Sequence, residues 1–175
     1  AKAILEPAKS VEDLKLQLLW AEVNANLKTL SLAEIPQLEK EVAKDRGFDP
    51  VYRLAKIWQL CGDEKKGNGL LEELFKAKLP AELKLKVRRD LAFSRMKIGN
   101  LKHAAILFQD LLGENHRQEE VILALVKIAR QEKNTVEIDS LLEKGDRFLT
   151  EKYPYNWEVA NLLMDLKQEA KAIKY

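Results

Sequence analysis

Apolar residues recur along the chain at the three- and four-residue spacing of one helix face. Val11, Leu14, Leu18, Val23 and Leu27 form the first such series, and similar series follow between turn residues. No stretch beside them keeps the alternation of apolar and polar residues that a half-buried strand requires, so the pattern favours helices throughout. We predict nine helices, at approximately 11–29, 32–45, 50–61, 64–78, 81–98, 101–113, 117–132, 135–150 and 155–173.

Capping residues indicate where these helices begin and end. Ser31 and Glu34 have the spacing of a capping box, in which each side chain bonds a backbone N–H at the start of a helix. Asp49 before Pro50 predicts another start, and Gly62 is the kind of left-handed residue that ends a helix. Most connections are about two to four residues long, which forces consecutive helices to lie antiparallel. We therefore expect stacked helical hairpins.

The turns between paired helices recur at a regular interval. Gly62-Asp63, Gly99-Asn100 and Lys133-Asn134 occupy corresponding elbows that are separated by 37 and 34 residues. A period near 34 residues is typical of helix-turn-helix solenoids. A single hairpin cannot bury its apolar stripe, whereas stacking buries the stripe against the neighbouring hairpins.

One segment carries the clearest resemblance to a known repeat. Residues 91–112 resemble a tetratricopeptide repeat in the placing of the small, turn and aromatic residues Ala92, Gly99, Ala104 and Phe108. The preceding unit shares part of this pattern, with Trp58 where the family favours tyrosine, but Gly67 stands where alanine is usual. The resemblance covers residues 50–132, and outside them only the layout of helix pairs matches.

The resemblance implies one all-α domain over residues 1–175, an α-solenoid of antiparallel helix pairs with the superhelix of the tetratricopeptide family. Its approximate units are 10–48, 49–80, 81–115 and 116–152, followed by a closing helix at 154–175. The chain would end before a partner for that last helix could form.

In the tetratricopeptide family, the first helix of each pair lines a concave face that contacts an extended peptide or a partner helix. Carried onto this sequence, the partner-binding positions are Tyr52, Lys56, Gln59, Lys86, Arg89, Phe93, Met96, Lys97, Lys127 and Arg130, with Glu120 and Leu123 beside them. Lysine and arginine outnumber acids on this face by six to one. The resemblance therefore implies an acidic protein or peptide partner with apolar anchors.

Two alternatives for this surface stay open. The basic residues around Arg88 could form a solvated stripe that is paired with acids of neighbouring helices. Self-association could instead use apolar residues of the last helix, such as Leu162 and Leu166. The set of residues with which chaperone-binding members of the family clamp a C-terminal carboxylate is missing, because Asp90 and Glu120 stand at two of its positions.

Composition narrows the classes of function. The 175 residues include 30 Lys and Arg against 28 Asp and Glu, a formal net charge of +2, which argues against a nucleic-acid-binding arm. An RNA-binding α-solenoid is a weaker alternative, suggested by the basic residues between Lys84 and Lys102. No stretch approaches the roughly 18 apolar residues of a membrane span. The start lacks a methionine or a leader, which suggests a fragment of a longer protein and cytoplasmic placement by default.

Candidate chemistry is sparse. The single cysteine, Cys61, excludes an intramolecular disulfide and a multi-cysteine zinc site, and we interpret it as buried. His103 and His116 belong to no metal-binding pattern and are expected at the surface. Residues 62–67 begin like a phosphate loop, but Asn68-Gly69 follows where lysine and serine or threonine are needed.

The three tryptophans, Trp20, Trp58 and Trp157, lie among aliphatic residues at helical spacing and are interpreted as core residues. No nucleophile, base and orienting group can be assembled from the motifs, so we expect no enzyme, no cofactor and no metal. The sequence therefore predicts a non-catalytic protein–protein interaction module or scaffold within a larger signalling, secretion or assembly protein.

Overall fold

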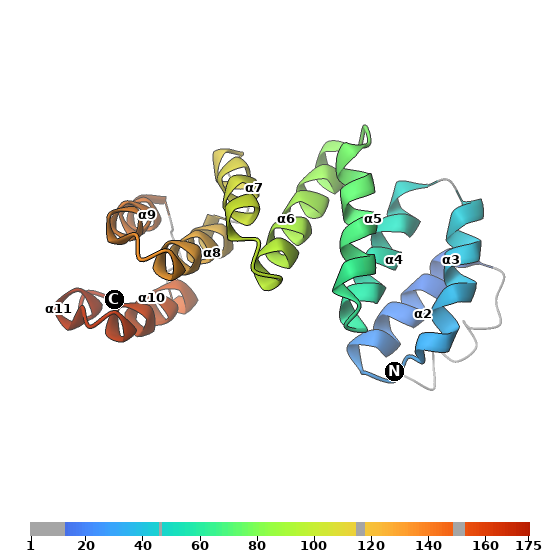
Figure 1. Cartoon of the computed structure of the whole chain (residues 1–175), viewed down its shortest axis with the longest axis horizontal. Helices are drawn as coiled ribbons and strands as arrows, with labels where there is room; N and C mark the ends of the chain where they lie inside the picture. The colour runs from blue at the N-terminus through green and yellow to red at the C-terminus, as the bar shows by residue number, and fades with distance from the viewer. Residues whose placement is uncertain (1–12, 46, 115–117, 149–152) are drawn as a thin grey trace. The chain divides into compact units, whose positions relative to one another are not determined.

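The computed structural model describes residues 13–45, 47–114, 118–148 and 153–175. Within these ranges every regular element is a helix and none is a strand, so the predicted all-α class is confirmed (Figure 1). Neighbouring helices pack as expected for an arrangement of helical repeats. None of the helices in these ranges combines the length and apolar character that a bilayer span requires.

The chain divides into two compact units, Ala1–Ser94 and Arg95–Tyr175, with the boundary inside one helix. The described helices of unit 1 are α2 (Leu14–Asn26), α3 (Ile35–Lys44) after a 3-10 turn at Leu32–Glu34, α4 (Phe48–Leu60), α5 (Glu64–Lys76) and α6 (Ala81–Lys97), the last of which crosses the boundary. Those of unit 2 are α7 (Leu101–Gly113), α8 (Gln118–Gln131), α9 (Thr135–Phe148), α10 (Tyr153–Asp165) and α11 (Glu169–Ala172). The single solenoid domain stays a prediction.

One type of elbow ends α2, α4, α6, α8 and α10, which we call the first helices. The residues in the left-handed conformation at these elbows are Lys28, Gly62, Gly99, Lys133 and Lys167. In each elbow the N–H of that residue bonds the carbonyl three residues earlier, and the next N–H bonds the carbonyl five residues earlier. This is the Schellman turn. The intervals are 34, 37, 34 and 34 residues, so the period predicted from three elbows extends over five.

The last predicted helix, 155–173, is wrong as a single element. The backbone of Lys167 has a φ of 57°, which a right-handed helix cannot continue. The N–H of Gln168 bonds the Leu163 carbonyl at 2.9 Å and closes the elbow between α10 and α11. The chain therefore forms a fifth hairpin with a short second helix, where the sequence predicted one closing helix.

The helix starts agree in part with the predicted caps. Ser31 and Glu34 form the predicted capping box, and the Asp63 side chain accepts a hydrogen bond at the start of α5. The start at Pro50 was placed too late: α4 begins at Phe48, and Asp49 lies in its first turn. There Asp49 pairs with Arg53 one turn on, at 2.9 Å, in place of capping the helix.

The core of unit 1 lies between α2, α3, α4 and α5. Leu18, Ile35 and Ile57 are essentially inaccessible to solvent. The side chain of Gln59 lies across Gly67, where an added Cβ would be 2.9 Å from the Ala55 carbonyl oxygen. The missing side chain of Gly67 therefore allows α5 to approach α4 closely.

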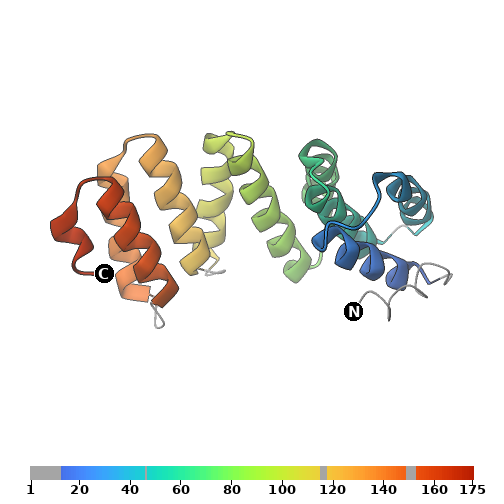
Figure 2. The same cartoon turned by 90° about the horizontal axis from the view of Figure 1, so that it is seen from below.

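The core of unit 2 is centred on α8, which contacts α7, α9 and α10. Figure 2 shows the helices of this unit lying side by side. The side chains of Val121, Phe108 and Tyr155 are completely buried. The ring of Tyr155 occupies the space over Gly145, where any Cβ would collide with its hydroxyl. A glycine is therefore required at that position of α9.

Candidate functional site

The predicted partner-binding residues lie on three of the first helices. Unit 1 holds Tyr52, Lys56, Gln59, Lys86, Arg89 and Phe93, and unit 2 holds Met96, Lys97, Lys127 and Arg130. The boundary between the units thus divides the predicted surface into two parts, and each part has its own geometry.

In unit 1, three of the predicted residues converge on one buried carboxylate. Asp90 of α6 is only 7% exposed. The hydroxyl of Tyr52 donates to its Oδ2 at 2.7 Å, and Lys56 Nζ lies 3.2 Å from the same oxygen. Arg89 binds the other oxygen, with Nη2 at 2.9 Å and Nε at 3.0 Å. We call these four residues the Asp90 cluster, and it joins α4 to α6.

The charges of the Asp90 cluster stabilise one another. Burial alone would raise the pKa of Asp90, but the Lys56 charge, the Tyr52 hydrogen bond and the Arg89 guanidinium together hold that pKa below its usual value. Burial and the bond to Asp90 raise the pKa of Tyr52, so its phenol keeps its proton. Asp90 is therefore ionised at neutral pH, and Lys56 and Arg89 point their charge into the protein.

The other predicted residues of unit 1 are also engaged. Lys86 pairs with Glu82 one turn earlier at 2.6 Å, and Gln59 lies against α5 as described above. Phe93 is half-buried. All three basic residues predicted in this unit have an acidic neighbour, but Lys86 and Arg89 pair within α6 itself and Arg88 is only 7% exposed, which differs from a solvated stripe paired with neighbouring helices.

In unit 2, two of the three predicted basic residues bridge two first helices. Lys127 Nζ lies 3.0 Å from Glu158 Oε2, and Arg130 Nη2 lies 3.0 Å from Asp165 Oδ2. These two bridges join α8 to α10. Their side chains are between 41% and 60% exposed, so water surrounds both pairs. Met96 is half-buried and Lys97 is exposed at the end of α6.

The 34-residue period identifies a further part of this surface. Leu123, Lys127 and Arg130 correspond, one repeat later, to Trp157, Asn161 and Met164. Trp157 is 64% exposed and Met164 is 53% exposed, and Asn161 between them is exposed too. We call these three residues the α10 face.

The burial of residues in α10 contradicts two predictions about this helix. The core interpretation of Trp157 is wrong, whereas Trp58 is buried as expected. Leu162, expected at the surface, is only 5% exposed. Each residue turns about 100° around a helix, so with Val159 and Leu163 facing the interior, Trp157 lies on the opposite side. The repeat register carries part of this information, because Trp157 is the equivalent of the half-buried Leu123, whose stripe on α8 includes the exposed Lys127 and Arg130.

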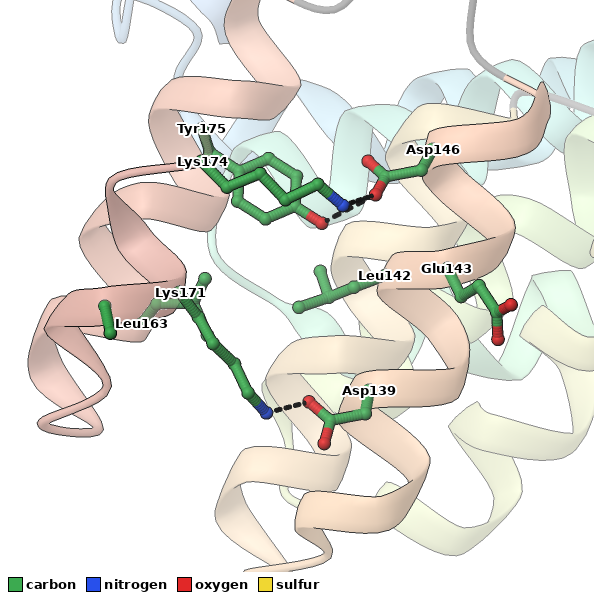
Figure 3. A pocket seen from close by; sticks show the side chains of 9 residues that line it. Asp139, Leu142, Glu143, Asp146, Leu163, Lys171, Lys174 and Tyr175 are labelled. Atoms are coloured by element: carbon green, nitrogen blue, oxygen red, sulfur yellow. Dashed lines mark hydrogen bonds and ion pairs between the residues drawn. The ribbon is translucent and has the colours of Figure 1, made fainter.

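A cavity of about 440 Å³ lies on the other side of unit 2, between α9 and the α10–α11 hairpin (Figure 3). Lys171 reaches across it to Asp139 at 2.6 Å, and Lys174 pairs with Asp146. The hydroxyl of Tyr175 donates to Asp146 as well, at 3.1 Å. These bonds hold the short hairpin against α9, so the charges lining the cavity are already satisfied within the chain.

A second cavity, of about 390 Å³, lies between α7 and α8 and corresponds to the first by the repeat register. Its residues Ala105, Gln109, Ala129 and Glu137 stand 34 residues before Asp139, Glu143, Leu163 and Lys171. The later groove is crossed by the ion pair between Asp139 and Lys171, whereas the equivalent residues of the earlier groove are Ala105 and Glu137, which cannot form an ion pair. Repeated helix pairs thus form repeated grooves, in which the side chains decide whether a groove is bridged.

The remaining candidates for chemistry are isolated. Within the described part of the chain, no three His, Cys, Asp or Glu side chains gather as a metal ion would require. Cys61 is half-buried, less than predicted, and burial raises the pKa of its thiol, which disfavours the reactive thiolate. His103 is exposed, as expected, and His116 lies outside the described residues.

Comparison of the chain with protein-family models, curated proteins and solved structures finds no match. The tetratricopeptide resemblance accordingly stays a prediction, carried by the motif residues and by the period of the five elbows.

Proposed function

We propose that this protein is a non-catalytic interaction module of the tetratricopeptide-like kind, within a larger signalling, secretion or assembly protein. Its docking site is the α10 face. The observation that carries the proposal is the 64% exposure of Trp157, at the repeat position that the half-buried Leu123 holds in α8. A single exposed apolar residue is ordinary, but Met164 lies two turns further along the same stripe.

The chemistry of these residues supports docking of a protein. Tryptophan and methionine are enriched at protein interfaces. Tryptophan offers a large apolar area and is over-represented among the residues that dominate binding energy. Asn161 and the bridges at Glu158 and Asp165 provide a polar surround for this apolar stripe.

The ion pairs beside the α10 face bear on which groups of the partner supply the affinity. An acidic peptide would have to displace Glu158 from Lys127 or Asp165 from Arg130. Exposed pairs of this kind contribute about 0–1 kcal/mol each, so exchanging them gains little affinity. We therefore propose that apolar side chains of the partner, packed on Trp157 and Met164, supply the affinity, and that charges adjust its orientation.

A matched pair of variants tests the proposal. We would compare affinity capture from native lysate by the wild type, by Trp157→Ala/Met164→Ala, and by the control Val136→Ala/Ile173→Ala. The control residues belong to the same unit and are 79% and 86% exposed, so the control removes exposed apolar surface outside the α10 face. A protein retained by the wild type and the control but lost by the α10 variant supports the site. Identical capture by all three contradicts it.

A further inference from the structure

The α10 face also indicates which partner it fits. We propose that the occupant is a second copy of this chain, an inference that rests on the proposed function. Two α10 helices pack antiparallel across a two-fold axis that passes close to Asn161. Three features of the face favour this occupant: the spacing of the apolar residues, the nature of the residue between them and the charge beside them.

The spacing of the face is compatible with a two-fold axis. Trp157 and Met164 are seven residues apart, which is two helical turns or roughly 10 Å. A two-fold axis through their midpoint places Trp157 of each copy on Met164 of the other, the reciprocal contact of an isologous interface. Contacts between a methionine sulfur and an aromatic ring are favourable. Both apolar residues are then covered by one symmetric contact.

Asn161 lies near the midpoint and therefore faces its own copy across the axis. A carboxylate or an ammonium group at that position would oppose a like charge. A primary amide carries two donors and an acceptor, so it can bond an identical group in the reverse orientation. Asparagine is thus one of the few polar residues that suits a two-fold axis.

The charge beside the face favours a second copy over a strongly charged partner. Glu158 and Asp165 are neutralised by Lys127 and Arg130 of the same chain. An acidic or basic partner would meet no uncompensated charge of the opposite sign on these residues. Two copies bring together two neutral, apolar surfaces. The formal net charge of the whole chain, +2, adds little repulsion.

The size of the face sets the strength to expect. Stable interfaces bury about 800 Å² on each partner, whereas the apolar part of this face consists of two large side chains. We therefore expect a weak dimer, visible in sedimentation velocity between about 1 µM and 1 mM. Trp157→Ala and Met164→Ala should each raise the dissociation constant by about tenfold or more, and the Val136→Ala control should leave it unchanged.

Position 161 gives the sharpest test of the axis. Asn161→Asp and Asn161→Lys each place like charges opposite one another, so each variant alone should sediment as a monomer at concentrations where the wild type dimerises. Mixing the two variants should restore a dimer. In a Cys61→Ser background, Asn161→Cys should form a cross-linked dimer with a short bis-maleimide, and Val136→Cys should not.

A wild-type chain that stays monomeric over the whole concentration range overturns the second-copy proposal. So does a dimer that is indifferent to Trp157→Ala, or a charge-swapped mixture that stays monomeric. If the chain is monomeric but capture of another protein still depends on Trp157 and Met164, the proposed function stands and only the identity of the partner is wrong. If capture is also indifferent to both residues, the two proposals fail together.

Discussion

The two units use the charges of their first helices in opposite ways. In unit 1, Lys56 and Arg89 hold a carboxylate that is 7% exposed. In unit 2, Lys127 and Arg130 bridge to carboxylates that are 49% and 60% exposed. Lys56 and Lys127 stand at equivalent repeat positions, each six residues before an elbow, so the same residue type is structural in one unit and exchangeable in the other. A basic stripe in a repeat sequence is therefore not evidence of a free binding surface.

The largest expected difference between the units is in stability. Lys56→Met/Arg89→Met leaves Asp90 buried with Tyr52 as its remaining partner in the cluster, and removing the partners of a buried charge costs about 3–5 kcal/mol. Urea denaturation of the full chain, followed by hydrogen exchange of the α4 and α6 amides, measures the loss.

The matched control for that variant is Lys127→Met/Arg130→Met, whose carboxylate partners remain in water. It should change the free energy of unfolding by less than about 1 kcal/mol. Adding Asp90→Asn to the unit 1 variant should recover part of the loss, because a neutral amide is cheaper to bury than a charge. Equal losses in the two double variants would show that the contrast between the units is wrong.

The next expected difference between the units is in how their stability depends on pH. The pKa of Asp90 is lower in the folded protein than in the unfolded chain, where it is about 3.9, so the unfolded chain binds this proton more readily. The stabilisation is complete above about pH 4 and is lost as the pH falls through the folded pKa. Asp90→Asn should therefore be less stable than the wild type at pH 7, and this gap should close in acid.

Hydrogen exchange of the α4 and α6 amides against pH measures this gap, with the α8 and α10 amides as the internal reference. A gap of constant size from pH 7 to pH 3 would mean that Asp90 does not contribute through its charge.

The helical part of the fold is predictable from local signals, and its failures are local too. Helical periodicity, the Ser31 capping box and the elbow glycines were sufficient for the hairpins. The prediction lacks the break after α10 because the left-handed residue there is Lys167, and a lysine does not by itself indicate this conformation. The turn near Lys28 agrees with the predicted helix end at about 29, but it was not included in the predicted period.

The site was less predictable because it depends on distances between helices. Asp90 and Glu158 are both acids on first helices, and their sequence surroundings do not show that one is buried among three donors while the other lies in water. The exposure of Trp157 could have been predicted from the sequence. It follows from the repeat register, whereas the surrounding apolar residues favoured a core position.

A smaller change in stability is expected when glycine and lysine are exchanged at the elbows. A Cβ at Gly62 would meet no atom within 4 Å, so Gly62→Lys costs only the left-handed conformation, about 1 kcal/mol. The reverse change, Lys133→Gly, removes the strain of a left-handed lysine and should stabilise unit 2. The gain should be only several tenths of a kcal/mol, because glycine loses more conformational freedom on folding than lysine does. Thermal unfolding of the two variants measures both signs. Two changes of the same sign would contradict the shared elbow geometry.

The smallest expected effect is the change in stability when Trp157, the exposed tryptophan of α10, is removed. Trp157→Ala should alter the free energy of unfolding by no more than about 0.5 kcal/mol, because its side chain is 64% exposed. Trp58→Ala provides the contrast: Trp58 is 4% exposed, its indole N–H donates to Glu39 at 3.0 Å and Lys66 lies over its ring, so about 3–5 kcal/mol should be lost. Urea midpoints of the two variants measure the difference. A stability loss at Trp157 comparable with that at Trp58 would mean that this side chain packs within its own chain, and then it could not serve as the anchor of a docking face.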